Sequence, residues 1–341
     1  MRRLKYNSDY MSRKMDRDLE QLEEKITALY VNATNQVTSR FYDYAKKIGP
    51  ELEYLRLQLE NGLITETEYY LLIRSKILNT KLYKAAITLF TNMLVNADVA
   101  AMALVRGELP YVIASSFNFV QSLGWAAADE AGLSVGTFQI FNVDAVQKLI
   151  KDNPRLLPHV DLPADKLWNK DRINNTITQA IMQGHDMPTI AKKLQEVANM
   201  DENAAMRTAR TAYTYAENLG RDEAYQKLKA QGIPVKKMWS AILDKRTRET
   251  HRLLNGTYAN DDDMFGEGIL DVLLKCPADP NGEPQEIYNC RCRESIVFPD
   301  SLVDHSNDDD IYEKFMKETD PKSYEALKDR NYFAQHRIHG H

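Results

Sequence analysis

The sequence predicts an α+β protein that is predominantly α-helical, with long N-terminal helices and a compact C-terminal domain that contains short strands. The chain has 14 Gly and 12 Pro among 341 residues, which is few for a many-turned sandwich or barrel. Apolar residues recur at intervals of three and four along most of the chain before residue 230, as amphipathic helices require. From residue 236 onward this spacing gives way to aromatic and β-branched runs between turn-forming residues.

The composition limits the class of protein. A length of 341 residues is enough for about two domains at ~150 residues each. The 44 Lys and Arg against 49 Asp and Glu give a formal charge of 44 − 49 = −5, which argues against a globally basic nucleic-acid binder. Three cysteines cannot form a disulfide framework and suit a reducing compartment. Because no stretch has the ~18–20 unbroken apolar residues of a membrane span, and no apolar segment follows the basic N-terminus, we expect no membrane partner and a cytoplasmic origin.

The N-terminal region, residues 1–152, should consist of helices. Apolar residues at helical spacing predict a first helix, which Gly49-Pro50 should end because proline disfavours helical backbone in the residue before it. Thr65 and Glu68 have the spacing of a capping box and should begin a further helix. The predicted helices cover residues 8–44, 51–60, 65–94 and 95–150, and within the last stretch a new helix is expected to open at Asn142.

Three prolines within residues 153–165 predict a linker between the two parts of the chain. The C-terminal domain should then cover residues 166–299, followed by a polar tail over residues 300–341. Helices are expected over residues 168–182, 187–197 and from 201 onward, then a strand over 236–243, a short helix over 247–254, irregular structure over 257–298, and a tail helix over 311–319. The histidines near the end of the tail are expected to be exposed rather than part of a site.

The polar residues that could form a functional site are concentrated between residues 239 and 292. Asp244 should cap the short helix by accepting from its first backbone N–H groups. Asp244, Thr247, Arg248 and His251 are three or four residues apart and should share one side of that helix. We expect these side chains to place the helix against the loop that carries Cys290, Arg291 and Cys292.

The three cysteines lie close together in the sequence, and two interpretations of them stay open. His251, Cys276, Cys290 and Cys292 could supply the one-nitrogen, three-sulfur set that structural zinc accepts. A zinc ion would explain how a stretch with little regular structure keeps a fixed shape. Against this, Cys-x-Cys is tighter than the common Cys-x-x-Cys spacing. The alternative is buried thiols beside a helix-capping histidine.

An enzyme is the second class of function to consider. Asp244, His251 and a cysteine could act as base, orienting group and nucleophile. A further alternative is a metal-dependent enzyme, nuclease- or transferase-like, built on His251 and the cysteines. However, the sequence has no nucleophile elbow, no Walker-type phosphate loop and no Gly-x-Gly-x-x-Gly. The sequence therefore favours a protein without catalytic activity and predicts no catalytic residues.

The spacing of the polar residues resembles a known family. The runs Asp244-x-x-Thr247-Arg248-x-x-His251 and Asn289-Cys290-Arg291-Cys292 are similar to the C-terminal signature of the phage Mu protein F-like minor head proteins, the phage head morphogenesis family. The resemblance covers residues 165–297, and the N-terminal half agrees only in its general helical character. The signature residues are Trp239, Asp244, Thr247, Arg248, His251, Gly256, Asn289 and Arg291.

The resemblance implies a minor capsid protein of a tailed phage that binds the portal protein and other capsid or scaffold proteins. It implies a place inside the virion near the portal vertex, and the host cytoplasm during assembly. The long N-terminal helices are suitable surfaces for docking on the portal or scaffold, in the manner of a helix in a groove.

Contact with double-stranded DNA is a further implication with two open interpretations. The basic residues proposed for it are Lys236, Lys237, Lys245, Arg246, Arg252 and Arg293, with Arg248 and Arg291 nearby. Such a patch would neutralise phosphates and give salt-dependent affinity without sequence preference. Alternatively, these cations are solvated or paired with acids such as Asp261, Asp262 and Asp263.

Overall fold

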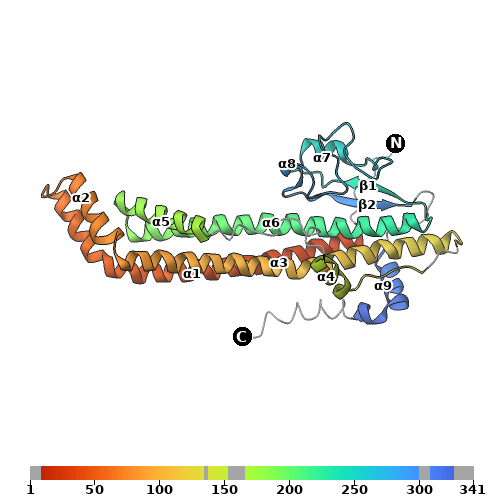
Figure 1. The fold of residues 1–341 in the computed structure, drawn as a ribbon, viewed down its shortest axis with the longest axis horizontal. Coiled ribbons are helices and arrows are strands. Elements are labelled where there is room, and N and C mark those ends of the chain that lie inside the picture. Colours follow the sequence, from red (N-terminus) through yellow and green to blue (C-terminus); the bar gives the residue numbers. More distant parts are fainter. Residues whose placement is uncertain (1–8, 134–136, 153–165, 299–307, 326–341) are drawn as a thin grey trace. The chain divides into compact units, whose positions relative to one another are not determined.

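The computed structural model describes residues 9–133, 137–152, 166–298 and 308–325 (Figure 1). The helices are α1 (Tyr10–Glu60), α2 (Glu66–Ile73), the π-helical turn η1 (Arg74–Leu78), α3 (Lys81–Glu130), α4 (Val143–Asp152), α5 (Lys166–Met182), α6 (Met187–Ala230), α7 (Glu249–Leu254), α8 (Pro284–Ile287) and α9 (Asp308–Thr319). Strands β1 (Lys236–Ser240) and β2 (Arg293–Val297) form an antiparallel pair in which Trp239 lies opposite Glu294. The predominantly helical α+β prediction is therefore confirmed. The predicted linker and the C-terminal histidines lie outside the described residues.

Helix α1 does not end at Gly49-Pro50, so that prediction was wrong. The helix continues through Pro50 to Glu60. Gly49 has no Cβ to clash with the proline ring, which removes part of the steric reason for a break. The buried residues Tyr44, Ile48 and Leu52 continue the apolar stripe on both sides of the proline. Packing of that stripe outweighs the hydrogen bond that the proline removes.

The helix predicted over residues 65–94 is two helices. Its capping box is confirmed, because Thr65 Oγ1 accepts from the Glu68 N–H at 3.2 Å and Glu68 Oε2 accepts from the Thr65 N–H at 2.8 Å. However, α2 ends at Ile73 and passes through η1. Thr80 Oγ1 then accepts from the Tyr83 N–H at 3.1 Å at the start of α3. A threonine that caps without an acidic partner three residues later gives a weaker start signal in the sequence.

Three further boundaries differ from the prediction. The helix expected to stop near Val197 is part of one continuous α6, in which Ala198, Asp201 and Ala205 keep the buried spacing. The helical stretch expected up to residue 150 is interrupted after α3, since residues 131–133 and 137–142 contain no helix, whereas the new helix expected at Asn142 is confirmed as α4. The strand stops at Ser240 and the short helix starts only at Glu249, because the residues between them form a turn.

The chain forms two compact units, each made of separate stretches of sequence. Unit 1 contains Met1–Gln21, Val105–Val160 and Thr208–His341, and unit 2 contains Leu22–Leu104 and Asp161–Arg207. These units cut across the predicted division between residues 1–152 and 166–299. Helices α1, α3 and α6 each contribute residues to both units.

Unit 1 contains the β-pair and the helices next to it. In its core the rings of Phe117 and Phe141 are stacked, with 3.8 Å between their centroids. Helices α3 and α6 approach closely at Gly220, where an added Cβ would lie 2.4 Å from the carbonyl oxygen of Ile113. Only glycine fits there, so this position fixes the packing of the two helices that support the sheet.

The regular elements that the structure describes in unit 2 are all helices, joined by short turns. Its core is apolar, with Ile26, Phe41, Ile73, Phe90 and Ile177 buried. Within it lies a polar cluster in which Asp98 accepts from the Tyr30 hydroxyl at 2.5 Å and from the Asn169 amide at 3.1 Å. Such buried polar groups require partners to offset their lost hydration.

Among the residues that the structure describes, one helix, α3, contains an 18-residue window that is apolar enough to cross a membrane by length and composition. Of that window, 44% is buried inside the protein. Core helices of water-soluble proteins meet the same criterion, so the window is weak evidence for a span.

Candidate functional site

The turn between β1 and α7 is built by Asp244 and Thr247. Asp244 accepts from the Arg246 N–H at 2.8 Å, and Thr247 Oγ1 accepts from the Asp244 N–H at 3.0 Å. The predicted role of Asp244 as helix cap was wrong, because the N-cap position belongs to Arg248, whose side chain makes no capping bond. Asp244 and Thr247 therefore close the turn before α7 instead of lying on the helix.

Two arginines connect this turn to the loop of residues 288–292. Arg291 donates both guanidinium nitrogens to the Asp244 carboxylate, at 2.8 and 2.7 Å, which is the bidentate geometry of strong carboxylate–arginine pairs. Hydrogen bonding to Arg291 lowers the pKa of Asp244 well below its ordinary value, so the carboxylate stays charged. Arg248 donates to the Tyr288 carbonyl. The structure thus brings Asp244, Arg248 and Arg291 together.

The same loop binds to one face of α6. The Asn289 N–H donates to Thr211 Oγ1 at 3.0 Å, and Thr214 Oγ1 donates to the Cys290 carbonyl at 3.0 Å. Asn218 donates to the Cys292 carbonyl at 3.1 Å and accepts from the Glu294 N–H at 2.7 Å. These helix residues were not among the predicted site residues. Their signal was available, because polar residues at positions 211, 214 and 218 follow helical spacing among alanines.

Trp239 and Gly256 place α7 beside β1. Trp239 is fully buried, with its ring edge-on to His251 at 5.2 Å and to Phe265 at 5.4 Å between centroids. The Gly256 N–H donates to the Trp239 carbonyl at 2.8 Å, and the Trp239 N–H donates to the Thr257 carbonyl at 2.9 Å. Gly256 has φ of 83°, which only glycine adopts without strain. The chain therefore leaves α7 in a direction that returns it to the strand.

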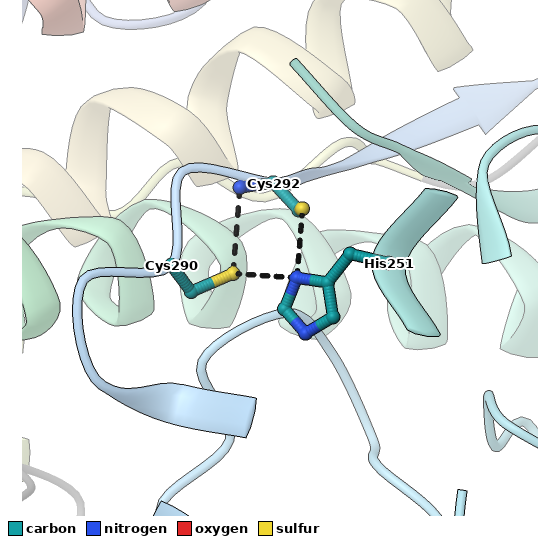
Figure 2. A group of neighbouring side chains, drawn as sticks. All are labelled: His251, Cys290 and Cys292. Carbon is teal, nitrogen blue, oxygen red and sulfur yellow. Dashed lines mark hydrogen bonds between the residues drawn. The ribbon is translucent and has the colours of Figure 1, made fainter. Parts of the chain in front are cut away.

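His251, Cys290 and Cys292 form one buried cluster (Figure 2). His251 Nδ1 lies 3.3 Å from Cys292 Sγ and 3.7 Å from Cys290 Sγ. The Cys292 N–H donates to Cys290 Sγ at 3.4 Å. The contact with Cys292 holds the pKa of Cys290 well below its usual value, and the same contact raises the pKa of Cys292.

Cys276 is not part of this cluster, so the predicted four-residue metal set is corrected to three residues. The potential ligand atoms of His251, Cys290 and Cys292 all lie within 4.8 Å of one another. Among the described residues, these three form the group of His, Cys and acidic side chains that could hold a metal ion. Cys276 is buried elsewhere in unit 1, where burial, then Glu294 and Asp222, raise the pKa of its thiol. Its proximity in sequence to the other cysteines gave no information about this separation.

The catalytic arrangement considered from the sequence is not assembled. The Asp244 carboxylate contacts Arg291 and the turn, and the carboxylate next to His251 Nε2 is that of Glu286, at 3.0 Å. Both cluster thiols are buried. Asp244 therefore does not orient His251 toward a cysteine.

Two of the six basic residues proposed for DNA are buried, which corrects that set. Lys237 makes a 2.6 Å ion pair with Asp222, and Arg293 donates to Glu217 at 3.0 Å. The exposed members are Lys236, Lys245, Arg246 and Arg252. Among the predicted acidic partners, Asp263 pairs with Lys229 of α6 at 2.8 Å.

A buried network of charges underlies the sheet and was not predicted. Arg221 of α6 donates to Asp9 at 2.8 and 3.0 Å and to Glu217 at 3.1 Å. Arg293 of β2 contacts Glu217 and also Asp16 of α1. Residues near the start of the chain thus share one network with residues of α6 and β2 inside unit 1.

Comparison with known proteins matches the part of the chain that contains this site. Residues 171–295 match the family model described as Phage Mu protein F like protein. The minor head protein GP7 of Bacillus phage SPP1 is 32% identical over 161 residues, covering 46% of this chain and 50% of GP7. The NAD(+)–arginine ADP-ribosyltransferase EFV of Enterococcus faecalis is 32% identical over 120 residues, covering 35% of this chain and 24% of the transferase.

An uncharacterized protein of Haemophilus influenzae is 27% identical over 180 residues, covering 47% of this chain and 39% of that protein. The chain thus spans between about a quarter and a half of the length of these curated relatives. No solved structure matches it.

Proposed function

We propose that the chain is a minor head protein of a tailed phage that binds the portal during head assembly, because residues 171–295 match the family model described as Phage Mu protein F like protein. The observation that carries the proposal is that the matched segment includes the contacts of Asp244 with Arg291 and of Arg248 with Tyr288. These contacts, here called the clamp, join the turn before α7 to the loop of residues 288–292. The similarity to GP7, whose name is minor head protein, supports the same function. Capsid or scaffold proteins would be further partners, with the virion interior as the final location.

A structural role agrees with how the polar residues are used. The charged side chains of Asp244, Arg248 and Arg291 form hydrogen bonds that join the turn before α7 to the loop of residues 288–292. The match to the transferase covers only 24% of that protein, so its named activity is not carried over to this chain. In the proposed function, the chain acts by binding other proteins and not by catalysis.

The surface best suited to the portal lies in unit 2, around the turn that joins α1 to α2. Leu63 and Leu71 are 71% and 61% exposed. Tyr54, Leu57 and Tyr70 are also exposed in this part of the chain. Exposed apolar side chains on helices are suited to insertion into a groove of a partner.

The test is co-purification with the portal protein and incorporation into procapsids, at low and at high salt. The variant Leu63→Ser with Leu71→Ser should reduce both at least tenfold, and high salt should preserve the wild-type complex because the contact is apolar. The matched control is Leu243→Ser with Leu253→Ser, which removes two equally apolar side chains of unit 1, each 57% exposed. Normal incorporation of the Leu63 and Leu71 variant would reject docking through this turn.

Deleting the N-terminal helix is not a usable test of docking. Asp9, just before α1, contacts Arg221, and Asp16 of α1 contacts Arg293 in unit 1. Their removal would leave these two buried arginines with a single carboxylate, that of Glu217, to share. Loss of incorporation would then report unfolding and not the loss of a docking surface.

We also propose that the exposed cations Lys245, Arg246 and Arg252 contact double-stranded DNA. They lie on the turn before α7 and on α7 itself, so they present positive charge on one short segment. Reversal of all three to Glu should weaken DNA binding and lower the slope of log affinity against log salt by about 2–3. Reversal of the exposed Lys192 in unit 2 should change little. An unchanged salt slope would exclude this segment as the contact.

A further inference from the structure

We propose that His251, Cys290 and Cys292 bind a divalent cation of the zinc class, with His251 Nδ1 and the two sulfurs as ligands. Imidazole nitrogen and thiolate sulfur are the ligands that zinc prefers in proteins. The three side chains come from α7 and from the loop that precedes β2, and all three are buried. This inference is independent of the proposed role in the phage head.

The distances between the ligand atoms fit a tetrahedral ion. With Zn–N of about 2.0–2.1 Å and Zn–S of about 2.3 Å, the N···S edge of a tetrahedron is about 3.6 Å. The observed separations from His251 Nδ1 are 3.3 Å to Cys292 Sγ and 3.7 Å to Cys290 Sγ. Binding would therefore require only small movements of the side chains.

Hydrogen bonding alone leaves the cluster incompletely explained. The ring nitrogen Nδ1 has one lone pair or one proton, so it forms one good hydrogen bond at a time. Figure 2 nevertheless shows both sulfurs directed at this single nitrogen. A cation among the three atoms would interact with each of them at once.

The surroundings supply the outer contacts that such sites use. His251 Nε2 is buried and 3.0 Å from Glu286 Oε2, but it makes no hydrogen bond. When Nδ1 binds a metal, Nε2 carries the proton, and the Glu286 carboxylate can accept it as in carboxylate–histidine–zinc triads. The Cys292 N–H already donates to Cys290 Sγ at 3.4 Å, which would stabilise a thiolate.

The ion would link parts of the chain that are about 40 residues apart, since His251 and Cys292 are separated by 41 positions. Between them the described structure has little regular backbone, with the four-residue helix α8 and an isolated bridge of Phe265 with Leu274. A metal that bridges both ends would stabilise this region against unfolding. Three protein ligands leave the fourth tetrahedral position to a water molecule.

The test measures metal on the full chain, purified in reducing buffer without chelator. We expect one zinc per chain, and cobalt(II) added to the metal-free protein should produce thiolate-to-cobalt absorption that zinc abolishes. Cys290→Ser and Cys292→Ser should each weaken cobalt binding more than 100-fold. The matched control is Cys276→Ser, which removes the third buried thiol and should leave binding unchanged. Glu286→Gln should weaken affinity about 10- to 100-fold.

The wild-type chain keeps the test decisive if a serine variant fails to fold. Removing zinc from the wild type with a chelator should lower its melting temperature, and adding zinc should restore it. Absence of cobalt absorption in the reduced wild-type chain, or an equal loss of binding in Cys276→Ser, would overturn the proposal. The proposal would also be overturned if the chain purified in reducing buffer contained a Cys290–Cys292 disulfide.

Discussion

Asn289 has a left-handed backbone, with φ of 55°, directly before the two cluster thiols. Asparagine is enriched in this conformation because its short polar side chain tolerates it. At the scale of a residue, this position explains why the loop turns so that its N–H reaches Thr211 and both following sulfurs reach His251.

We expect Asn289→Gly to leave the free energy of unfolding of unit 1 unchanged within ~0.5 kcal/mol, because glycine adopts positive φ freely. Asn289→Ala should lower it by about 1–2 kcal/mol, because alanine pays the left-handed penalty. Urea unfolding of the two variants provides the measurement. Equal stability of the glycine and alanine variants would show that backbone conformation is not what this residue supplies.

At the scale of elements, α1 carries a proline at an exposed position in its interior. Pro50→Ala restores a backbone hydrogen bond and removes the ring clash, and should raise the free energy of unfolding by roughly 2–2.5 kcal/mol. This figure is the cost of ~3 kcal/mol for an interior proline less the lower entropy of the unfolded proline chain. Thermal melting of the two proteins tests it, and a lower melting temperature for the alanine variant would contradict it.

The packing of α3 and α6 within unit 2 should depend on pH. Burial, and then the nearby charge of Asp98, raise the pKa of Asp201 to about 7, although Arg172 at 3.2 Å opposes the shift. The folded protein therefore keeps a proton that the unfolded chain loses above its ordinary pKa of 3.8. Stability from this group is present below pH 4 and falls as pH rises to 7, by at most ~1.4 kcal/mol per unit.

Urea unfolding of the wild type and of Asp201→Asn between pH 4 and 8 measures this dependence. The variant cannot titrate, so the difference in free energy of unfolding between the two proteins should change with pH up to about 7 and then level off. A constant difference over the whole range would show that Asp201 is ionised in both states.

The sequence predicted the elements that depend on local signals. The capping box at Thr65 and the positions of most helices follow from spacing and from cap residues, which act within a few positions. The helix ends predicted at Pro50 and near Val197 were wrong. In α1 and in α6, packing of a continuous apolar stripe outweighs the local sequence features that indicate an end. The strand and the short helix were located, but the turn between them was not resolved.

The site was predictable in part. The clamp of Asp244 with Arg291 and the proximity of His251 to Cys290 and Cys292 agree with the loop contact expected from the sequence. Cys276 and Lys237 behave differently, because their surroundings come from segments distant in sequence. The partner of Lys237, Asp222, lies on another element, and no spacing rule could have identified it.

At the scale of the whole molecule, charges from the start of the chain, from α6 and from β2 meet in unit 1. Arg221→Met should lower the free energy of unfolding of unit 1 by about 3–5 kcal/mol, because the buried Glu217 and the partly buried Asp9 both lose this partner. Arg40→Met is the control, since its 3.6 Å pair with Asp43 is exposed and should contribute less than ~1 kcal/mol. Hydrogen exchange over residues 208–298 measures the effect, and equal protection in both variants would refute it.

The pairing of Arg293 with Asp16 also has a consequence for the order of events on the ribosome. The two residues are 277 positions apart, so at ~5–20 residues per second the second emerges roughly 15–55 s after the first. Until then the first turns of α1 are without one of their charged partners. A chain truncated before β2 would not complete this core, so only chains that extend past β2 would form a finished unit 1.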